Sequence, residues 1–171
     1  SVSARAVFAA NQAVREAAAE SEAYQNMGTT LVAAVSYAGG TAVTNVGDSR
    51  AYHVTREGIT RVTKDHSLVE RMVDRGDITA EEARRHPSRN LITRALGPDA
   101  DAQCDGYICP MESGEYLLLC TDGLVNTVTD QEMLFEVIHG AEPDTSLDRM
   151  LEIAKKQGAP DNVTAVLMRK L

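Results

Sequence analysis

Tryptophan is absent from this 171-residue chain and phenylalanine occurs only twice, so any core must be built mainly from aliphatic side chains. Hydrophobic residues still make up 43% of the chain, which is enough for the core of about one domain. Cysteine occurs three times, an odd number, and no Cys-x-x-Cys pair is present. This pattern argues against a disulfide framework and a structural zinc site, and it predicts a reducing, cytoplasmic location.

Positive charge is also scarce, because 17 Lys and Arg residues stand against 25 Asp and Glu residues and leave a net charge of −8. A nucleic-acid-binding protein needs a basic surface, so we expect no nucleic-acid partner. No apolar run reaches the length of a membrane span, so we expect no membrane segment in this chain. The acidic excess is compatible with cation binding, although a plain acidic surface explains it more simply.

The first third of the chain shows a helix followed by strands. Residues 3–22 are rich in Ala, Glu, Gln and Arg with an apolar face, which predicts one helix. Residues 27–63 alternate between apolar and polar residues and predict a strand meander. Glycine pairs such as Gly39-Gly40 favour hairpin turns, and Glu57-Gly58 predicts a second one.

The remainder predicts more helices and two further strands. Residues 67–96 form a polar, charged excursion that contains two short helices. A strand buried on both faces is predicted at residues 116–120, and a closing strand at residues 162–171. Between them, a capping box opens a helix after residue 129, and a further helix is expected at residues 145–157. Strands and helices that come in blocks favour an α+β fold.

Three aspartates stand where predicted strands begin or end. Asp122 follows the strand in "YLLLCTDGL", Asp48 follows one in "TAVTNVGDSR", and Asp161 precedes the strand in "APDNVTAVLM". Hard divalent cations such as Mg²⁺ and Mn²⁺ prefer carboxylate ligands, and strand ends from distant segments can meet at one edge of a sheet. Each aspartate alone is explained more simply as a turn residue, because Asp, Asn and Gly favour turns.

The amino-acid sequences of these segments, and their order along the chain, resemble those of the metal-dependent serine/threonine protein phosphatases, the protein phosphatase 2C family, in its bacterial form. The matching stretches cover residues 27–168 in the family's order. They are "MGTTLVAAV", "NVGDSRAYHV", "TKDHSLVERMVDRGDITAEEARRHPSRNLITRALG", "LLLCTDGLVNTVTDQE" and "APDNVTAVLM". The short motifs are specific for this family because they occur together and in order, with matching sequence between them.

The resemblance implies an α+β fold, an antiparallel β-sandwich flanked by helices in the order α-β-β-α. It implies that residues 1–171 form a single partial phosphatase domain with a flap-like excursion at residues 67–96. The implied activity is hydrolysis of phosphoserine and phosphothreonine on proteins, in line with bacterial signalling. The implied partners are phosphorylated protein substrates and a Ser/Thr kinase in the same pathway.

The resemblance also implies metal ligands. Asp122 matches the family's "DG" carboxylate and Asp161 its "DN" carboxylate, which share two core Mn²⁺ or Mg²⁺ ions. Asp48 matches a ligand of a third, more weakly held ion. In that scheme a water held by the two core ions attacks phosphorus in line, and no phosphoenzyme forms.

Family motifs that come before the first helix have no counterpart in this sequence. They are an arginine that grips phosphate, a Glu-Asp pair, and an Asp-Gly-x-Gly-Gly-His segment whose aspartate bridges the core metals. We therefore expect an N-terminally truncated domain that is inactive alone and associates with itself through an exposed sheet edge. The alternative is a pseudophosphatase or regulatory binding module. A third possibility is the related branch that dephosphorylates anti-sigma-factor antagonists. It shares the fold but usually lacks the flap segment "HPSRNLITRALG", so it fits this sequence less well.

Overall fold

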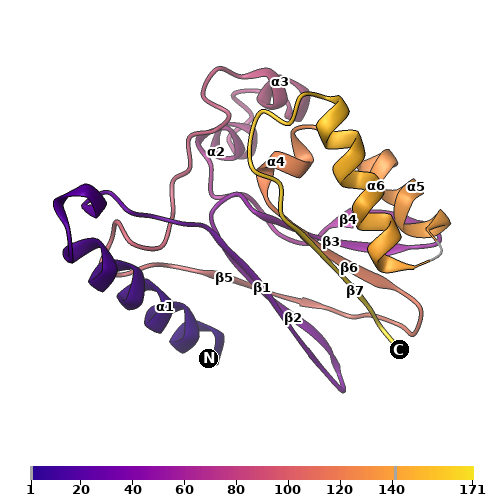
Figure 1. Ribbon diagram of the computed structural model, residues 1–171, viewed down its shortest axis with the longest axis horizontal. Coiled ribbons are helices and arrows are strands. Elements are labelled where there is room, and N and C mark those ends of the chain that lie inside the picture. Colours follow the sequence, from indigo (N-terminus) through magenta and orange to yellow (C-terminus); the bar gives the residue numbers. More distant parts are fainter. Residues whose placement is uncertain (1, 141) are drawn as a thin grey trace. The chain divides into compact units, whose positions relative to one another are not determined.

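The strands of the computed structural model, which describes residues 2–140 and 142–171, form two sheets (Figure 1). The strand orders are β1-β2-β5 and β4-β3-β6-β7. The strands are β1 (Leu31–Tyr37), β2 (Gly40–Val46), β3 (Arg50–Thr55), β4 (Gly58–Arg61), β5 (Asp105–Cys109), β6 (Tyr116–Cys120) and β7 (Ala165–Arg169). The helices are α1 (Val2–Ala19), η1 (Glu22–Tyr24), α2 (Leu68–Asp74), α3 (Ala80–Arg85), α4 (Asp122–Val125), α5 (Asp130–His139) and α6 (Pro143–Lys156). Antiparallel sheets accompanied by helices confirm the predicted α+β fold.

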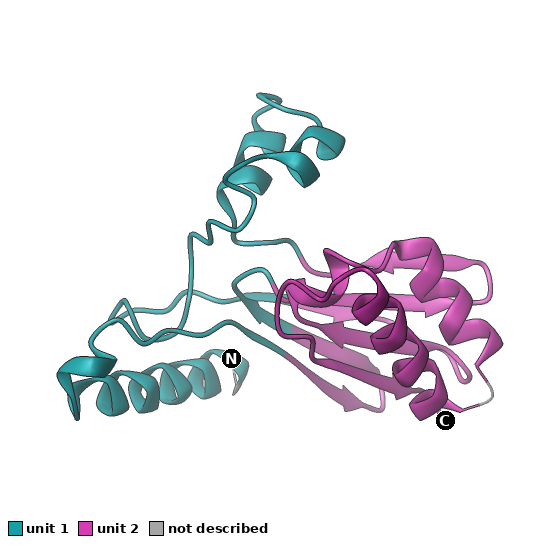
Figure 2. Ribbon diagram, turned by 45° about the horizontal axis from the view of Figure 1, so that its top comes forward, with its two compact units in different colours: residues 1–32, 44–48, 64–106 teal, residues 33–43, 49–63, 107–171 magenta. Residues whose placement is uncertain are grey.

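The chain divides into two compact units, each built from segments that are distant in sequence (Figure 2). Unit 1 consists of residues 1–32, 44–48 and 64–106, and unit 2 consists of residues 33–43, 49–63 and 107–171. Asp122 and Asp161 therefore belong to unit 2, whereas Asp48 belongs to unit 1.

The four-stranded sheet brings the ends of three strands into one row. Arg50 of β3 pairs with Cys120 of β6, and Cys120 pairs with Ala165 of β7. Both pairings are antiparallel, so β6 ends at the side of the sheet where β3 and β7 begin. Neighbouring Leu117 and Leu118 point to opposite faces and are both fully buried, which confirms that β6 is covered on both sides.

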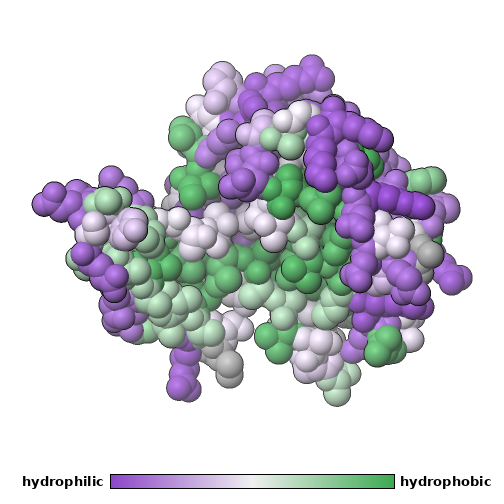
Figure 3. All heavy atoms as spheres, in the orientation of Figure 1, coloured by the Kyte–Doolittle hydropathy of each residue, from purple (hydrophilic) through white to green (hydrophobic). Residues whose placement is uncertain are grey.

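The main core of unit 2 combines one face of this sheet with α4, α5 and α6. Its buried residues are Tyr52, Val54, Leu118, Cys120, Leu124, Val128, Met133, Val137, Met150 and Ala154. Helix α5 begins at the predicted capping box, in which the Thr129 hydroxyl accepts from the N–H of Glu132 and the Glu132 carboxylate accepts from the N–H of Thr129. Charged residues cover the outward side of α6, as Figure 3 shows.

The smaller core of unit 1 is formed around α1. Val7 packs with Val46 and Leu96, and all three are buried. Asn11, also fully buried, accepts a hydrogen bond from the N–H of Gly97 at 2.7 Å and donates to two backbone carbonyls just beyond it. The alanine-rich surface of α1 appears pale green in Figure 3.

Several details differ from the sequence-based expectations. The turns fall one residue earlier than predicted, so Gly40 and Gly58 are the first residues of β2 and β4. Helix α1 ends at Ala19 and a separate 3-10 turn follows, so residues 3–22 are not one continuous helix. Strand β5 and helix α4 were not predicted, because both are short and carry no clear periodic pattern. Within the described parts of the chain, no helix has the length and apolar character that crossing a membrane requires.

Candidate functional site

Asp122 lies just beyond the end of β6, where it forms the first residue of α4. Its carboxyl group is partly buried, and burial is the main reason that its pKa is raised above the ordinary aspartate value. The negative charge of Asp161 raises the pKa further, while the N–H groups of Gly123 and Asp122 and the charge of Arg50 oppose the shift. A nearby cation would relieve both unfavourable effects, since it favours the ionised carboxylate.

Asp161 lies in the loop that leads into β7, and it is exposed. One carboxylate oxygen, Oδ1, accepts a hydrogen bond from the backbone N–H of Asn162 at 2.7 Å. This contact fixes the carboxylate next to its own loop and leaves the other oxygen to face solvent or a ligand. The structure thus brings Asp161 close enough to Asp122 for their charges to interact.

Thr121 joins the loops that carry these two aspartates. Its backbone N–H donates to the carbonyl of Thr164 at 3.0 Å, and its hydroxyl accepts from the N–H of Thr164 at 3.0 Å. Gly123 packs directly on the same loop, because a Cβ there would lie 2.3 Å from the carbonyl oxygen of Asn162. The spacing between Asp122 and Asp161 therefore depends on a close backbone contact that only glycine permits.

Arg50 is the cation at this end of the sheet. Its Nη1 donates to the hydroxyl of Tyr52 at 3.1 Å. Tyr52 is almost fully buried, and burial raises its pKa to about 12, with Arg50 opposing that shift. The tyrosine therefore stays protonated and holds the guanidinium in a position where its charge acts on Asp122.

Asp48 follows β2 after Gly47, and it is partly buried. Gly47 has a φ of +106°, and a Cβ there would lie 2.4 Å from Cγ2 of Thr30. The turn that presents Asp48 is thus possible only with glycine. Across residues 2–140 and 142–171, no group of three or more His, Cys, Asp and Glu side chains is arranged to hold a metal ion. The structure pairs Asp122 with Asp161, and the role of Asp48 as a third ligand stays a prediction.

The sequence showed the aspartates but not what holds them in place. The Thr121 contacts and the packing of Gly123 on Asn162 have no signal in the sequence beyond the glycine itself. Arg50 is a further residue that acts on this site, because its charge lowers the pKa of Asp122. The pairing of Arg50 with Cys120 could have suggested this, had the order of the strands been known.

Comparisons with known proteins agree on one family. The sequence model described as protein phosphatase 2C matches residues 2–168. The serine/threonine phosphatase stp of Listeria innocua is 37% identical over 153 residues, which cover 89% of this chain and 61% of that protein. The chain thus spans about three fifths of the length of this relative.

Solved structures share the fold. The serine/threonine phosphatase Stp1 from Staphylococcus aureus has a TM-score of 0.92 and 34% sequence identity, covering 98% of this chain and 66% of that chain. The catalytic domain of the serine/threonine protein phosphatase PstP, solved in complex with two manganese ions, has a TM-score of 0.82 and 34% identity. That match covers 96% of this chain and 68% of that one.

Proposed function

Because this chain belongs to the protein phosphatase 2C family, we propose that it is part of a metal-dependent phosphatase that hydrolyses phosphoserine and phosphothreonine on proteins. The observation that carries the proposal is the pair formed by Asp122 and Asp161 at the end of the four-stranded sheet. We further propose that residues 1–171 act as one partial domain with a flap at residues 67–96. Phosphorylated proteins are its substrates, and a Ser/Thr kinase of the same pathway produces them.

The proposed ions are Mn²⁺ or Mg²⁺, two in the core and a third bound more weakly. The donor set fits them, since both prefer oxygen ligands, and Asp122 carries a burial cost and a repulsion that a cation would offset. Asp122 and Asp161 would hold the core ions, and Asp48 the third. Such ions supply Lewis-acid stabilisation of phosphoryl oxygens and lower the pKa of a water molecule. The related PstP structure with two manganese ions supports this choice.

The chain's own residues orient the ligands and control charge. The hydrogen bond from Asn162 to Asp161 and the N–H groups around Asp122 hold both carboxylates in one geometry. Tyr52 restrains Arg50 through a hydrogen bond. The positive charge of Arg50 opposes protonation of Asp122 and so keeps the Asp122 carboxylate available as a ligand. Two carboxylates are few for a pair of dications, which repel each other strongly when they share a site. We therefore expect weak metal binding and low turnover for the 171 residues alone.

Metal binding by the 171-residue chain tests the ligand assignment. Asp122→Asn and Asp161→Asn should each weaken Mn²⁺ binding in calorimetry by at least about tenfold, since each removes a charged ligand. Asp148→Asn, which changes an exposed carboxylate of α6, is the matched control and should bind Mn²⁺ as the wild type does. Unchanged Mn²⁺ affinity in both site variants would overturn the assignment.

Turnover tests the activity. A chimera that places the leading segment of the Listeria innocua relative before this chain should dephosphorylate a phosphothreonine peptide in a Mn²⁺-dependent way. Asp122→Asn in the chimera should remove most of that activity. A chimera that binds Mn²⁺ and the phosphopeptide without hydrolysing it would favour the pseudophosphatase alternative.

A further inference from the structure

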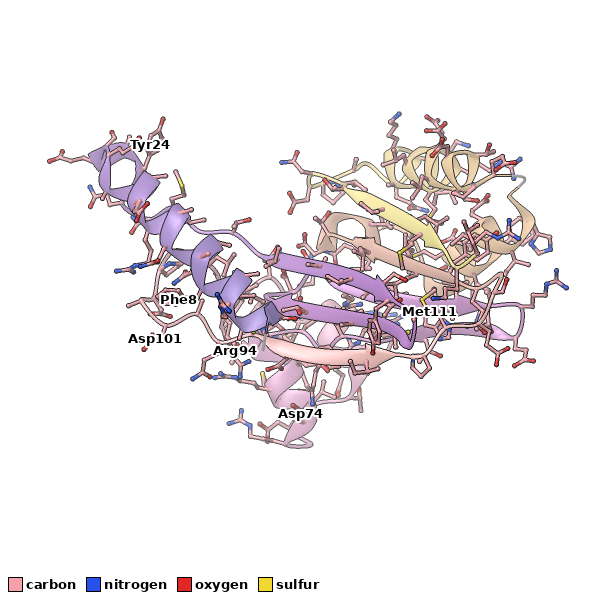
Figure 4. The ribbon with its side chains drawn as sticks, turned by 90° about the horizontal axis from the view of Figure 1, so that it is seen from below. Phe8, Tyr24, Asp74, Arg94, Asp101 and Met111 are labelled. Atoms are coloured by element: carbon pink, nitrogen blue, oxygen red, sulfur yellow. The ribbon has the colours of Figure 1, made fainter. Side chains whose placement is uncertain are left out.

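The imidazole of His66 connects three segments of unit 1. Its Nδ1 lies 3.0 Å from the backbone nitrogen of Gly47, and its Nε2 lies 3.0 Å from Oδ2 of Asp105. Arg94, labelled in Figure 4, donates to Oδ1 of the same aspartate at 2.9 Å. The side chain of His66 is only 6% exposed, so its polar atoms depend on these partners rather than on water.

The partners define the tautomer of the ring. A backbone N–H can only donate, so Nδ1 of His66 accepts from Gly47 and carries no proton. Nε2 therefore carries the proton and donates to Asp105, whose pKa is lowered chiefly by this hydrogen bond. The 3.1 Å approach of Arg94 Nη1 to Nε2 is then a contact between two donors that share the Asp105 carboxylate. The neutral imidazole thus accepts a hydrogen bond from Gly47 at Nδ1 and donates one to Asp105 at Nε2.

His66 engages both backbone groups of Gly47. Besides the ring contact, the N–H of His66 donates to the carbonyl oxygen of Gly47 at 2.9 Å. Gly47 packs closely on Thr30, because a Cβ at Gly47 would lie 2.4 Å from Cγ2 of Thr30. The residue that directly precedes Asp48 is therefore fixed by His66 on one side and by Thr30 on the other.

His66 also directly precedes the flap, residues 67–96. The carbonyl of His66 accepts from the N–H of Thr93 at 2.7 Å, and the N–H of Leu68 donates to the carbonyl of Leu91 at 2.9 Å. Ser67 and Ile92 form an antiparallel bridge between these two bonds. The two ends of the flap are thus paired at the residue whose ring holds the turn before Asp48.

We propose that His66 is a positioning residue that links the flap to the Asp48 turn, so that a change at the flap base shifts the position of the Asp48 carboxylate. The link itself rests on the contacts within unit 1, and only its consequence for metal binding rests on the proposed function. A flap that responds to a bound phosphoprotein would thereby alter the ligand of the third ion.

Two substitutions separate the roles of the ring nitrogens. His66→Asn keeps an acceptor near the place of Nδ1 but does not reach Asp105, whereas His66→Gln keeps a donor near Nε2 and lacks the acceptor for Gly47. Amide hydrogen exchange of the ¹⁵N-labelled 171-residue chain measures the outcome. His66→Gln should accelerate exchange of the Gly47 amide by about tenfold, and His66→Asn by less than about threefold. Equal exchange in the two variants would overturn the role of the ring.

A matched pair of cap deletions tests the link to the flap without touching His66. Ser67→Ala removes the N-cap of α2 at the flap base, and Thr79→Ala removes the N-cap of α3, a helix with no buried residue. Ser67→Ala should accelerate exchange at Gly47 by about threefold, and Thr79→Ala should leave it unchanged. If both variants leave Gly47 unchanged, the link does not exist, and this result stands even if the His66 variants fail to fold.

Mn²⁺ titration separates the link from the metal assignment. Asp48→Asn and His66→Gln should both weaken the weaker Mn²⁺ binding step severalfold, and His66→Asn should weaken it less. If Asp48→Asn has no effect on Mn²⁺ binding, the proposed third-ion role of Asp48 fails, while the exchange results still decide whether His66 links the flap to the turn. If Asp48→Asn weakens binding but His66→Gln does not, the link has no consequence for the metal and that part of the proposal is wrong.

Discussion

The Asp122 carboxylate is unfavourable for the fold when no cation is present. Its raised pKa means that the native state binds more protons than the unfolded state at pH values between the ordinary and the raised pKa. Stability therefore falls as the pH rises through that window, and the loss persists at neutral pH. An amide in the same place carries no charge and avoids this loss.

We expect Asp122→Asn to raise the free energy of unfolding of the metal-free chain at pH 7 by about 0.5–1 kcal/mol. The gain should vanish at a pH below the ordinary aspartate pKa, where the wild-type carboxyl group is protonated in both states. Urea unfolding in the presence of a chelator, at pH 3 and pH 7, measures both values. Asp148→Asn is the control. A free energy of unfolding at pH 7 that is lower for Asp122→Asn than for this control would contradict the prediction.

Gly123 is the second residue on which the site depends. Its missing side chain leaves room for the carbonyl of Asn162, and both contacting atoms at 2.3 and 3.0 Å belong to the backbone. Gly123→Ala should therefore displace the loop of Asp161, lower the free energy of unfolding by about 1–3 kcal/mol and weaken Mn²⁺ binding. Gly58→Ala is the matched control, because a Cβ at Gly58 has nothing within 4 Å. Thermal unfolding and calorimetry measure the two effects, and equal behaviour of both variants would disprove the argument.

Among the elements, α5 and α3 begin with the same capping box but differ in burial. Thr129 and Glu132 cap α5, which buries Met133 and Val137 in the core, whereas α3 has no buried residue. The loss of a cap should therefore affect global stability at α5 and only local order at α3. We expect Thr129→Ala to cost about 1 kcal/mol of unfolding free energy.

The cap of α5 also has a pH dependence. Hydrogen bonds from Thr129 lower the pKa of Glu132, so its contribution to stability is present above the unfolded-state pKa and is lost as the pH falls through the lowered value. The Thr129→Ala deficit should accordingly shrink in urea titrations at pH 3. Thr79→Ala, with the equivalent cap on α3, is the comparison, and an equal global loss there would show that burial does not decide the effect.

At the scale of the whole molecule, the described residues form hydrophobic clusters of different size in the two units. The cluster of unit 2 around Tyr52 and Leu118 contains ten buried residues, whereas the cluster of unit 1 around Val7 contains three. Apolar burial dominates local stability, so hydrogen exchange should be slowest in β3 and β6 and faster in α1. Leu118→Ala should lower the free energy of unfolding by about 2–5 kcal/mol, while Val7→Ala should mainly accelerate exchange in α1. Exchange in α1 as slow as in β6 would contradict this difference.

Self-association through an exposed sheet edge stays a prediction. Strands β1, β5 and β7 end their sheets in the strand order, and each carries exposed apolar side chains: Val35 and Tyr37 on β1, Ile108 on β5, and Val166 on β7. Unpaired edges with apolar residues favour pairing with another chain. Sedimentation should show concentration-dependent dimers, and Val166→Lys should reduce them more than Val166→Thr. A chain that remains monomeric at millimolar concentration would refute this expectation.

The local pattern of this sequence determined most of the secondary structure and the identity of the acidic residues. Alternation and glycine turns predicted β1 to β4, the buried run predicted β6, and the spacing of Thr129 and Glu132 predicted the start of α5. These features depend on residues that are only a few positions apart in the chain, which is why they can be predicted from the sequence. The turns at Gly40 and Gly58 were misplaced by one residue, because a glycine can precede a strand or begin it.

Only the tertiary structure decided which residues meet. The strand order places Arg50, Cys120 and Ala165 in one row, and so brings Asp122 and Asp161 together across about forty residues of chain. The folded chain also places the His66 ring between the backbone N–H of Gly47 and the carboxylate of Asp105. Such contacts join segments that are distant in sequence. They depend on the order and pairing of the strands, which local sequence patterns do not specify.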